Sequence, residues 1–262
     1  MHSQRANHLA AEGRRVFAVA RRYPLQTFSG ILTVLVIFIS LFTGAQYLAG
    51  SASVSHDRQG SLVLGLVLWN LLILSLSEIS RGIQAEAQIG TLEHLFLASQ
   101  SLLRVMLFRA FSSQVLFLAM NSVILVIVSL TSRTTLSASP AIMLPILAAL
   151  LATNGIGLAL GALALLWKRI GAAVGLVQFL VVSLVVPPFE QLISKSLLPW
   201  TNLLPLAPAA RALRSVMARQ EMLGWTDVVT VLANGCVYFL LGVFVFRLSD
   251  KLVRERGALA GY

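Results

Sequence analysis

Charged residues are scarce in this sequence. Asp, Glu, Lys and Arg account for 11% of its 262 residues, whereas an ordinary soluble domain has about 25%. Hydrophobic residues account for 57%, and the mean hydropathy is +0.84. A chain of this length in water would still need a substantial polar exterior. The shortage of charge therefore excludes an ordinary soluble domain and predicts an integral membrane protein.

Several chemical motifs are also missing. The chain has one cysteine, Cys236, so no disulfide can form within it. It has no G-x-x-x-x-G-K-[ST] phosphate loop to cradle ATP, and no H-E-x-x-H or C-x-x-C metal motif. The histidines are scattered outside the apolar segments and predict no metal site: His2, His8, His56 and His94. No nucleophile–base pair falls on one side of a membrane, which makes an enzyme the least favoured class.

Long segments without any charge are what the sequence has instead. Crossing roughly 30 Å of hydrocarbon takes about 20 mostly apolar residues in a helix. The runs are continuous rather than alternating, which favours helices over the strands of a barrel. Two of them are longer and should each hold one span with a polar flank. The charge-free segments are 23–56, 59–77, 110–132, 134–167, 170–189 and 228–246.

We therefore predict an all-α membrane protein with six transmembrane helices. The apolar run that begins at Leu25 is too long for the core of a cleaved signal peptide, so we expect it to be retained as span one. The centres of the spans carry no acid or base, which disfavours a proton- or sodium-driven transporter. The predicted spans are 25–47, 61–80, 106–130, 141–167, 170–186 and 228–247.

The distribution of positive charge predicts the orientation. The net charge is +10, and the basic residues lie between the apolar spans, which indicates membrane orientation rather than nucleic-acid binding. With the N-terminus inside, 14 of the Lys and Arg residues fall on the inner side and 6 on the outer side. Both termini are therefore predicted to be cytoplasmic, in a topology with the N-terminus in and the C-terminus in.

The segments outside the spans complete a single transmembrane domain, 1–262. Residues 1–23 are basic and predict an interfacial helix, or a disordered basic tail that only sets orientation. Residues 24–189 hold spans one to five, 226–247 hold span six, and 248–262 form a cytoplasmic tail. The connection 190–225 contains an apolar stretch that is too short for a span and is broken by prolines. It predicts an outer re-entrant or interfacial helical hairpin, with an ordinary surface loop as the alternative.

The inner segment after span two carries a distinctive pattern. On a helix, Ile89, Leu92 and Phe96 share one stripe, while Glu86 and Glu93 lie seven residues apart on another. Such a helix can rest passively on the inner leaflet, or it can be the handle through which a cytosolic protein moves the spans. The acidic stripe favours the handle, because the inner leaflet is itself negative.

The run Glu-x-x-x-Gly-Thr-Leu-Glu-x-Leu at 86–95 resembles the signature of the type-2 ABC exporter permeases. The six-span layout, the basic segment before span one and the Pro-rich segment 204–214 are also similar to that family. The resemblance implies that this segment is a coupling helix that docks on an ATP-binding subunit. Its coupling residues would be Glu86, Ile89, Gly90, Thr91, Leu92, Glu93 and Phe96.

The resemblance also implies partners. This chain has no second half and no fused ATP-binding domain, so two permease chains, alike or different, would assemble with two separate cytosolic ATP-binding subunits. ATP and Mg²⁺ would be held by those subunits, and this chain would bind no cofactor and no nucleic acid. The Ala-, Arg- and Leu-rich composition suggests a bacterial source, and hence the inner (plasma) membrane and its lipid bilayer as the location.

Small and polar residues within the spans have two interpretations each. Gly157 and Gly161 are spaced for close helix packing, within the chain or in a dimer, and the resemblance favours Gly171 and Gly175 as a dimer face. Glu78 is expected to pair with Arg81 or to reach the interface. Four amides either line a substrate path or form hydrogen bonds between helices: Asn70, Asn121, Asn154 and Gln178.

The function predicted from these features is export of an amphipathic or hydrophobic substrate, such as a drug, a lipid-like molecule or a peptide. Few charges in the spans favour such cargo over a free ion. The alternative is a membrane scaffold or assembly factor that recruits a cytosolic partner and moves no substrate.

Overall fold

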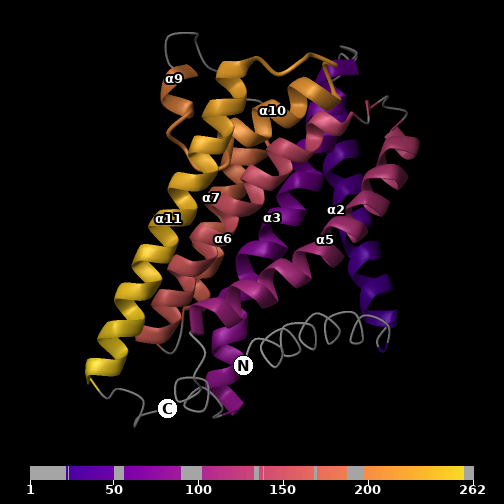
Figure 1. Cartoon of the computed structure of the whole chain (residues 1–262). Coiled ribbons are helices and arrows are strands. Elements are labelled where there is room, and N and C mark those ends of the chain that lie inside the picture. The colour runs from indigo at the N-terminus through magenta and orange to yellow at the C-terminus, as the bar shows by residue number, and fades with distance from the viewer. Residues whose placement is uncertain are drawn as a thin grey trace.

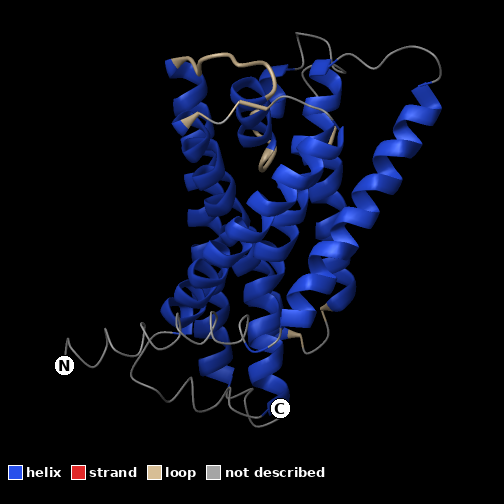
Figure 2. Ribbon diagram, turned by 90° about the vertical axis from the view of Figure 1, so that its right-hand side faces the viewer, coloured by secondary structure: helices blue, strands red, loops and turns tan. Residues whose placement is uncertain are grey.

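The described part of the protein is all helical. The computed structural model describes residues 24–49, 56–89, 102–132, 136–137, 139–167, 170–187 and 198–256, together with Arg22. No strand occurs within these ranges (Figures 1 and 2). The predicted all-α class is confirmed. The helices are α2 (Pro24–Ala49), α3 (His56–Ile89), α5 (Leu102–Ser132), η1 (Pro140–Ile142), α6 (Met143–Leu166), α7 (Gly171–Val185), α9 (Leu198–Thr201), α10 (Ala207–Met217) and α11 (Trp225–Arg256).

Four of these helices are long and apolar enough to cross a membrane, which indicates a membrane protein. Two more, α2 and α7, contain shorter apolar helices, Phe28–Gly44 and Gly171–Val185. Each of the six spans predicted from the sequence falls on one of these helices, and all six helices run along the long direction of the bundle (Figure 1). The long apolar segments are Gln59–Glu86, Leu102–Ser132, Pro140–Leu166 and Trp225–Glu255.

Helix α6 lies at the centre of the bundle and packs tightly against α11. A β-carbon built on Gly155 would overlap the carbonyl oxygen of Tyr238, and one built on Gly242 would overlap that of Gly155. A second contact lies two helical turns away, seven residues earlier on both α6 and α11. There, a β-carbon on Gly235 would lie 2.7 Å from the carbonyl oxygen of Ala148. Two contacts in the same seven-residue register mean that α6 and α11 run side by side in the same direction, with glycine allowing the backbones to meet.

A second face of α6 packs against α3. A β-carbon on Gly157 would lie 3.1 Å from the carbonyl oxygen of Leu76, and one on Gly161 would lie 2.9 Å from the side chain of Ile83. The glycine pair on span four thus serves packing within this chain. By contrast, no described atom lies within 4 Å of a β-carbon built on Gly171 or Gly175 of α7.

The outward faces of the peripheral helices are apolar. Large hydrophobic side chains are exposed along α2, α5, α7 and α11. In water such faces would aggregate, whereas hydrocarbon solvates them. Representative exposed residues are Phe28, Val126, Phe179, Leu240 and Phe244.

The ends of the bundle differ. The start of α2 and the end of α11 lie at one end, and α9 and α10 lie at the other (Figure 1). Within the predicted outer hairpin the structure shows two helical segments separated by a bend, where Leu206 has a φ of 68°. Pro208 lies in the first turn of α10, where its missing N–H breaks no helical hydrogen bond.

Buried polar contacts fasten this segment to the bundle. Arg214 of α10 is 2% exposed and donates hydrogen bonds to the carbonyl oxygens of Val185 and Val186, at the end of α7. Asn234 of α11 donates to the carbonyl oxygens of Asn202 and Leu204, at 2.9 and 3.1 Å. These bonds satisfy carbonyl groups at the end of α7 and in the bend, where helical partners are missing.

The glycine contact between α6 and α11 makes a prediction. Gly155→Ala should lower the free energy of unfolding by about 1–3 kcal/mol, because the added methyl group forces the two backbones apart. Gly44→Ala, on α2 where nothing lies within 4 Å, should be neutral or slightly stabilising, since alanine favours helix. Thermal unfolding of the purified variants in detergent measures both. Equal midpoints for the two variants would contradict the contact.

Candidate functional site

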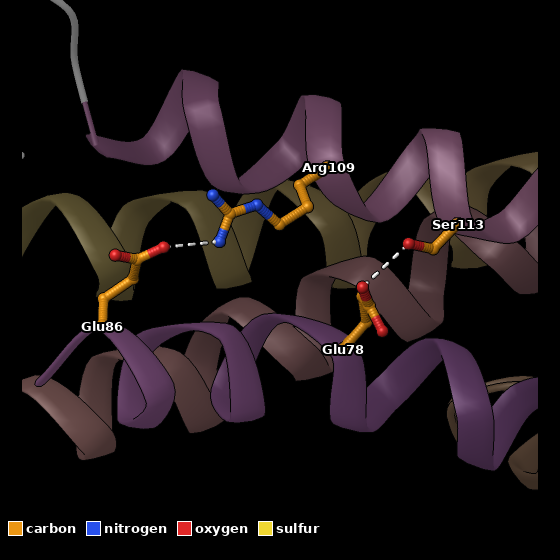
Figure 3. Close-up of polar contacts among 4 residues, drawn as sticks. All are labelled: Glu78, Glu86, Arg109 and Ser113. Atoms are coloured by element: carbon orange, nitrogen blue, oxygen red, sulfur yellow. Dashed lines mark hydrogen bonds and ion pairs between the residues drawn. The ribbon is translucent and has the colours of Figure 1, made fainter. Parts of the chain in front are cut away.

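A row of polar side chains joins α3 to α5 near the end where α3 finishes. Glu78 and Glu86 lie eight residues apart on α3, and Arg109 and Ser113 lie four residues apart on α5. Both spacings bring side chains to one face of a helix. The two helices run antiparallel, so the acidic face of α3 meets the polar face of α5 (Figure 3).

The outer pair of this row is an ion pair. Arg109 Nη1 donates to Glu86 Oε1 at 3.0 Å, and the two side chains are 16% and 17% exposed. A largely buried, charge-assisted hydrogen bond is stronger than one in water, and each charge would be costly to bury without the other. The pair therefore fastens the end of α3 to the beginning of α5.

The inner pair corrects the expectation for Glu78. Ser113 Oγ donates to Glu78 Oε1 at 2.8 Å, and Ser113 is buried. Arg81, the partner predicted from the i+3 spacing, is exposed instead. Burial explains the difference, because a carboxylate facing a neighbouring helix is satisfied by a donor on that helix rather than by one on its own solvent-facing side.

Most of the predicted coupling residues lie outside the described part of the chain. Those residues are Gly90, Thr91, Leu92, Glu93 and Phe96. Ile89 is the last residue of α3, and its side chain is likewise outside the description. Glu86 is described, and its carboxylate faces α5. The ion pair thus joins the two helices that flank residues 90–101.

The four amides predicted within the spans all bond between helices. Asn70 Nδ2 donates to Asn121 Oδ1 at 2.9 Å, which joins α3 to α5. Gln114 Nε2 donates to Asn154 Oδ1 at 2.8 Å, which joins α5 to α6. Gln178 Nε2 of α7 donates to Ser77 Oγ of α3 at 2.8 Å. These bonds support the packing interpretation, and a substrate path through the amides stays a prediction.

Four residues that make these contacts were not predicted from the sequence: Arg109, Ser113, Gln114 and Ser77. Gln114 stands within a charge-free segment and carried the same signal as the three asparagines. Arg109 lies at the edge of a span, where it was counted only for orientation. Ser77 and Ser113 gave no signal, because serine in an apolar helix usually bonds its own backbone.

Gly171 and Gly175 leave an open strip on α7. Their neighbours Leu176, Phe179 and Leu180 are exposed.

Within the described residues, no three His, Cys, Asp or Glu side chains gather as a metal site would require.

No protein-family model matches this sequence, and no curated protein matches it. Any functional proposal therefore depends on the motif at the end of α3 and on the contacts around it.

The ion pair makes a prediction. Glu86→Gln and Arg109→Met should each cost about 1–3 kcal/mol of stability, because each leaves a partly buried charge without its partner. The double variant should cost less than the two added together. The exposed pair Lys251–Glu255 on α11 is the control, and its Lys251→Met variant should change stability by about 0–1 kcal/mol. Strictly additive costs in a thermal double-mutant cycle would show that the two side chains do not interact.

Proposed function

We propose that this chain is the membrane subunit of an ATP-driven exporter of the type-2 ABC class. The observation that carries the proposal is the Glu-x-x-x-Gly-Thr-Leu-Glu-x-Leu motif that begins in the last turn of an apolar helix, α3. ATP and Mg²⁺ would be bound by separate cytosolic subunits, which dock on the motif segment and drive transport as they close.

The ion pair between Glu86 and Arg109 gives this docking a mechanical consequence. Because it fastens α3 to α5 on either side of residues 90–101, a push on that segment moves both helices together. Helix α3 is in turn packed against α6 at Gly157 and bonded to α7 through Ser77. A displacement of residues 90–101 would therefore move α3 and α5 together and, through α3, shift α6 and α7 instead of bending a single helix.

The proposed topology has six spans with both termini in the cytoplasm of a bacterial cell, in the inner membrane. Helices α2 and α7 would be the two additional spans, and residues 1–23 would lie along the inner surface. Two observations support this arrangement. The start of α2 and the end of α11 lie at the same end of the bundle (Figure 1), and Lys and Arg gather on the side assigned to the cytoplasm.

The proposed working unit contains two permease chains. Gly171 and Gly175 are the candidate dimer face, because neither has a described neighbour and the surrounding α7 surface is apolar. Small residues on such a face let two helices approach closely in lipid. The expected cargo is amphipathic or hydrophobic, since the amides that bond between the spans are neutral and the Glu86–Arg109 ion pair lies at the end of α3.

Co-purification tests the exporter proposal. The tagged chain, expressed in its native host and gently solubilised, should bring down a phosphate-loop ATPase in stoichiometric amount. A variant with Gly90→Pro and Glu93→Ala should stay in the membrane and lose that partner. Glu255→Ala, at the same end of the bundle on the exposed surface of α11, should keep it. A chain that purifies alone, or with a partner lacking a nucleotide site, would overturn the proposal.

The ATPase rate of the purified complex in lipid distinguishes an exporter from a scaffold that moves no substrate. An exporter should hydrolyse ATP at least about twofold faster when an amphipathic compound is added, because cargo binding is coupled to closure of the ATPase subunits. A scaffold should show the same rate with and without the compound.

The dimer face makes a further prediction. Gly171→Leu together with Gly175→Leu should reduce the dimer fraction in lipid nanodiscs at least about tenfold, because the added side chains hold the α7 backbones apart. Ala233→Leu, an equally exposed small residue on α11, is the control and should leave the dimer intact. Mass photometry counts the two species. An unchanged dimer fraction in the α7 variant would exclude this face.

A further inference from the structure

Two small cavities lie on opposite sides of the contact between α3 and α5. One, of about 50 Å³, opens between α2, α3 and α5, and is lined by Val34, Phe38, Trp69, Asn70 and Ile124 among others. The second, of about 100 Å³, lies between α3, α5, α6 and α10, and is lined by residues that include Leu71, Asn121, Ile146, Leu213 and Met217. Both walls are mostly apolar, and both cavities are large enough for more than a water molecule.

The partition between the cavities is thin. Val67 of α3 lines both of them. Asn70 lines the first and Asn121 lines the second, and the hydrogen bond between these two amides, at 2.9 Å, crosses from one to the other. A single neutral hydrogen bond contributes about 0.5–1.5 kcal/mol net. A ligand that offered its own hydrogen bonds could therefore replace it at little cost.

Asn70 gives the first cavity a polar group. It uses an amide N–H in its bond to Asn121, so its carbonyl oxygen remains available to a ligand donor. The neighbouring Trp69 lines the same cavity, but its Nε1 atom is enclosed by protein and does not open to it. The apolar wall of this cavity thus contains a hydrogen-bond acceptor.

We infer that the two cavities form one binding site for a neutral amphipathic molecule, a compact apolar body that carries a hydroxyl group. The hydroxyl group donates to Asn70 Oδ1, and the apolar body extends past Val67 toward the cavity beneath α10. The inference deepens the proposed function, since this molecule would be of the class that the exporter carries.

The wall chemistry and the position of the site select this class. No Asp, Glu, Lys or Arg is among the described residues that line either cavity, so a charged head group would be buried without a counterion. Trp69 lies well inside the apolar segment Gln59–Glu86, about 15 Å along the helix from its Gln59 end. Lipid head groups do not reach this depth, and lipid tails cannot donate a hydrogen bond to Asn70.

Fluorescence quenching tests the site on the full chain in lipid nanodiscs. Trp167, Trp200 and Trp225 are replaced by Phe, so that Trp69 is the reporter. The probes are 6-bromo-1-hexanol and 1-bromohexane, whose bromine quenches tryptophan on contact, compared at equal concentration in the lipid. Quenching by the alcohol should saturate, with half-saturation at about a fivefold lower concentration than any found for the bromide, as one hydrogen bond would give.

Three variants in the same background make the result specific. Asn70→Leu should weaken the alcohol about fivefold and bring it to the level of the bromide. Val67→Phe, which fills the partition, should abolish saturation. Gln178→Leu removes a polar contact that lies outside both cavities and should change nothing. Gel filtration and circular dichroism confirm that each variant is folded.

The outcomes either support or overturn the inference. Saturable quenching that Asn70→Leu weakens and Val67→Phe removes supports it. Quenching that rises linearly for both probes, or saturation that survives Val67→Phe, shows partition into lipid or binding elsewhere, and overturns it. The assay uses no ATP and no partner, so its failure leaves the exporter proposal standing. In the same way, a failed co-purification leaves the quenching result unaffected.

Discussion

The close approach of α6 to its neighbours is the constraint on which the rest of the bundle depends. In hydrocarbon, helices gain nothing by hiding apolar surface from lipid, so they associate through tight packing and through polar bonds. Gly155 brings α6 against α11, and Gly157 and Gly161 bring it against α3. These contacts leave α2, α5 and α7 around a rigid centre, with apolar faces turned outward.

Polar bonds then decide how the outer helices are placed. Apolar packing alone tolerates rotation and sliding of a helix, whereas a hydrogen bond between two buried side chains is lost by either motion. The pairs Asn70–Asn121 and Gln114–Asn154 set α5 against α3 and α6. At one end Glu86 and Arg109 fasten the helices that flank the motif segment, and at the other Arg214 fastens α10 to α7. Each end of the bundle is thus held by a buried polar contact between helices.

This arrangement connects three features that are far apart in the sequence. Residues 90–101 join the two helices that also form the partition between the cavities, and α10 closes the second cavity from the far end of the bundle. A displacement of α3 relative to α5 at the motif end would act directly on the contact between Asn70 and Asn121. The proposed coupling and the proposed binding site therefore depend on the same helix pair.

The sequence by itself determined that the chain is helical and apolar, and roughly where each long helix lies, because hydrocarbon permits only segments that satisfy their own backbone. It also identified four of the amides that bond between helices. Only the tertiary structure decided their partners. Glu78 bonds Ser113 of another helix rather than Arg81 of its own, and Gly155 meets Gly242, far along the chain. The physical reason is that a helical period fixes which face of a helix a residue occupies, while the neighbour that covers that face is chosen by packing of the whole bundle.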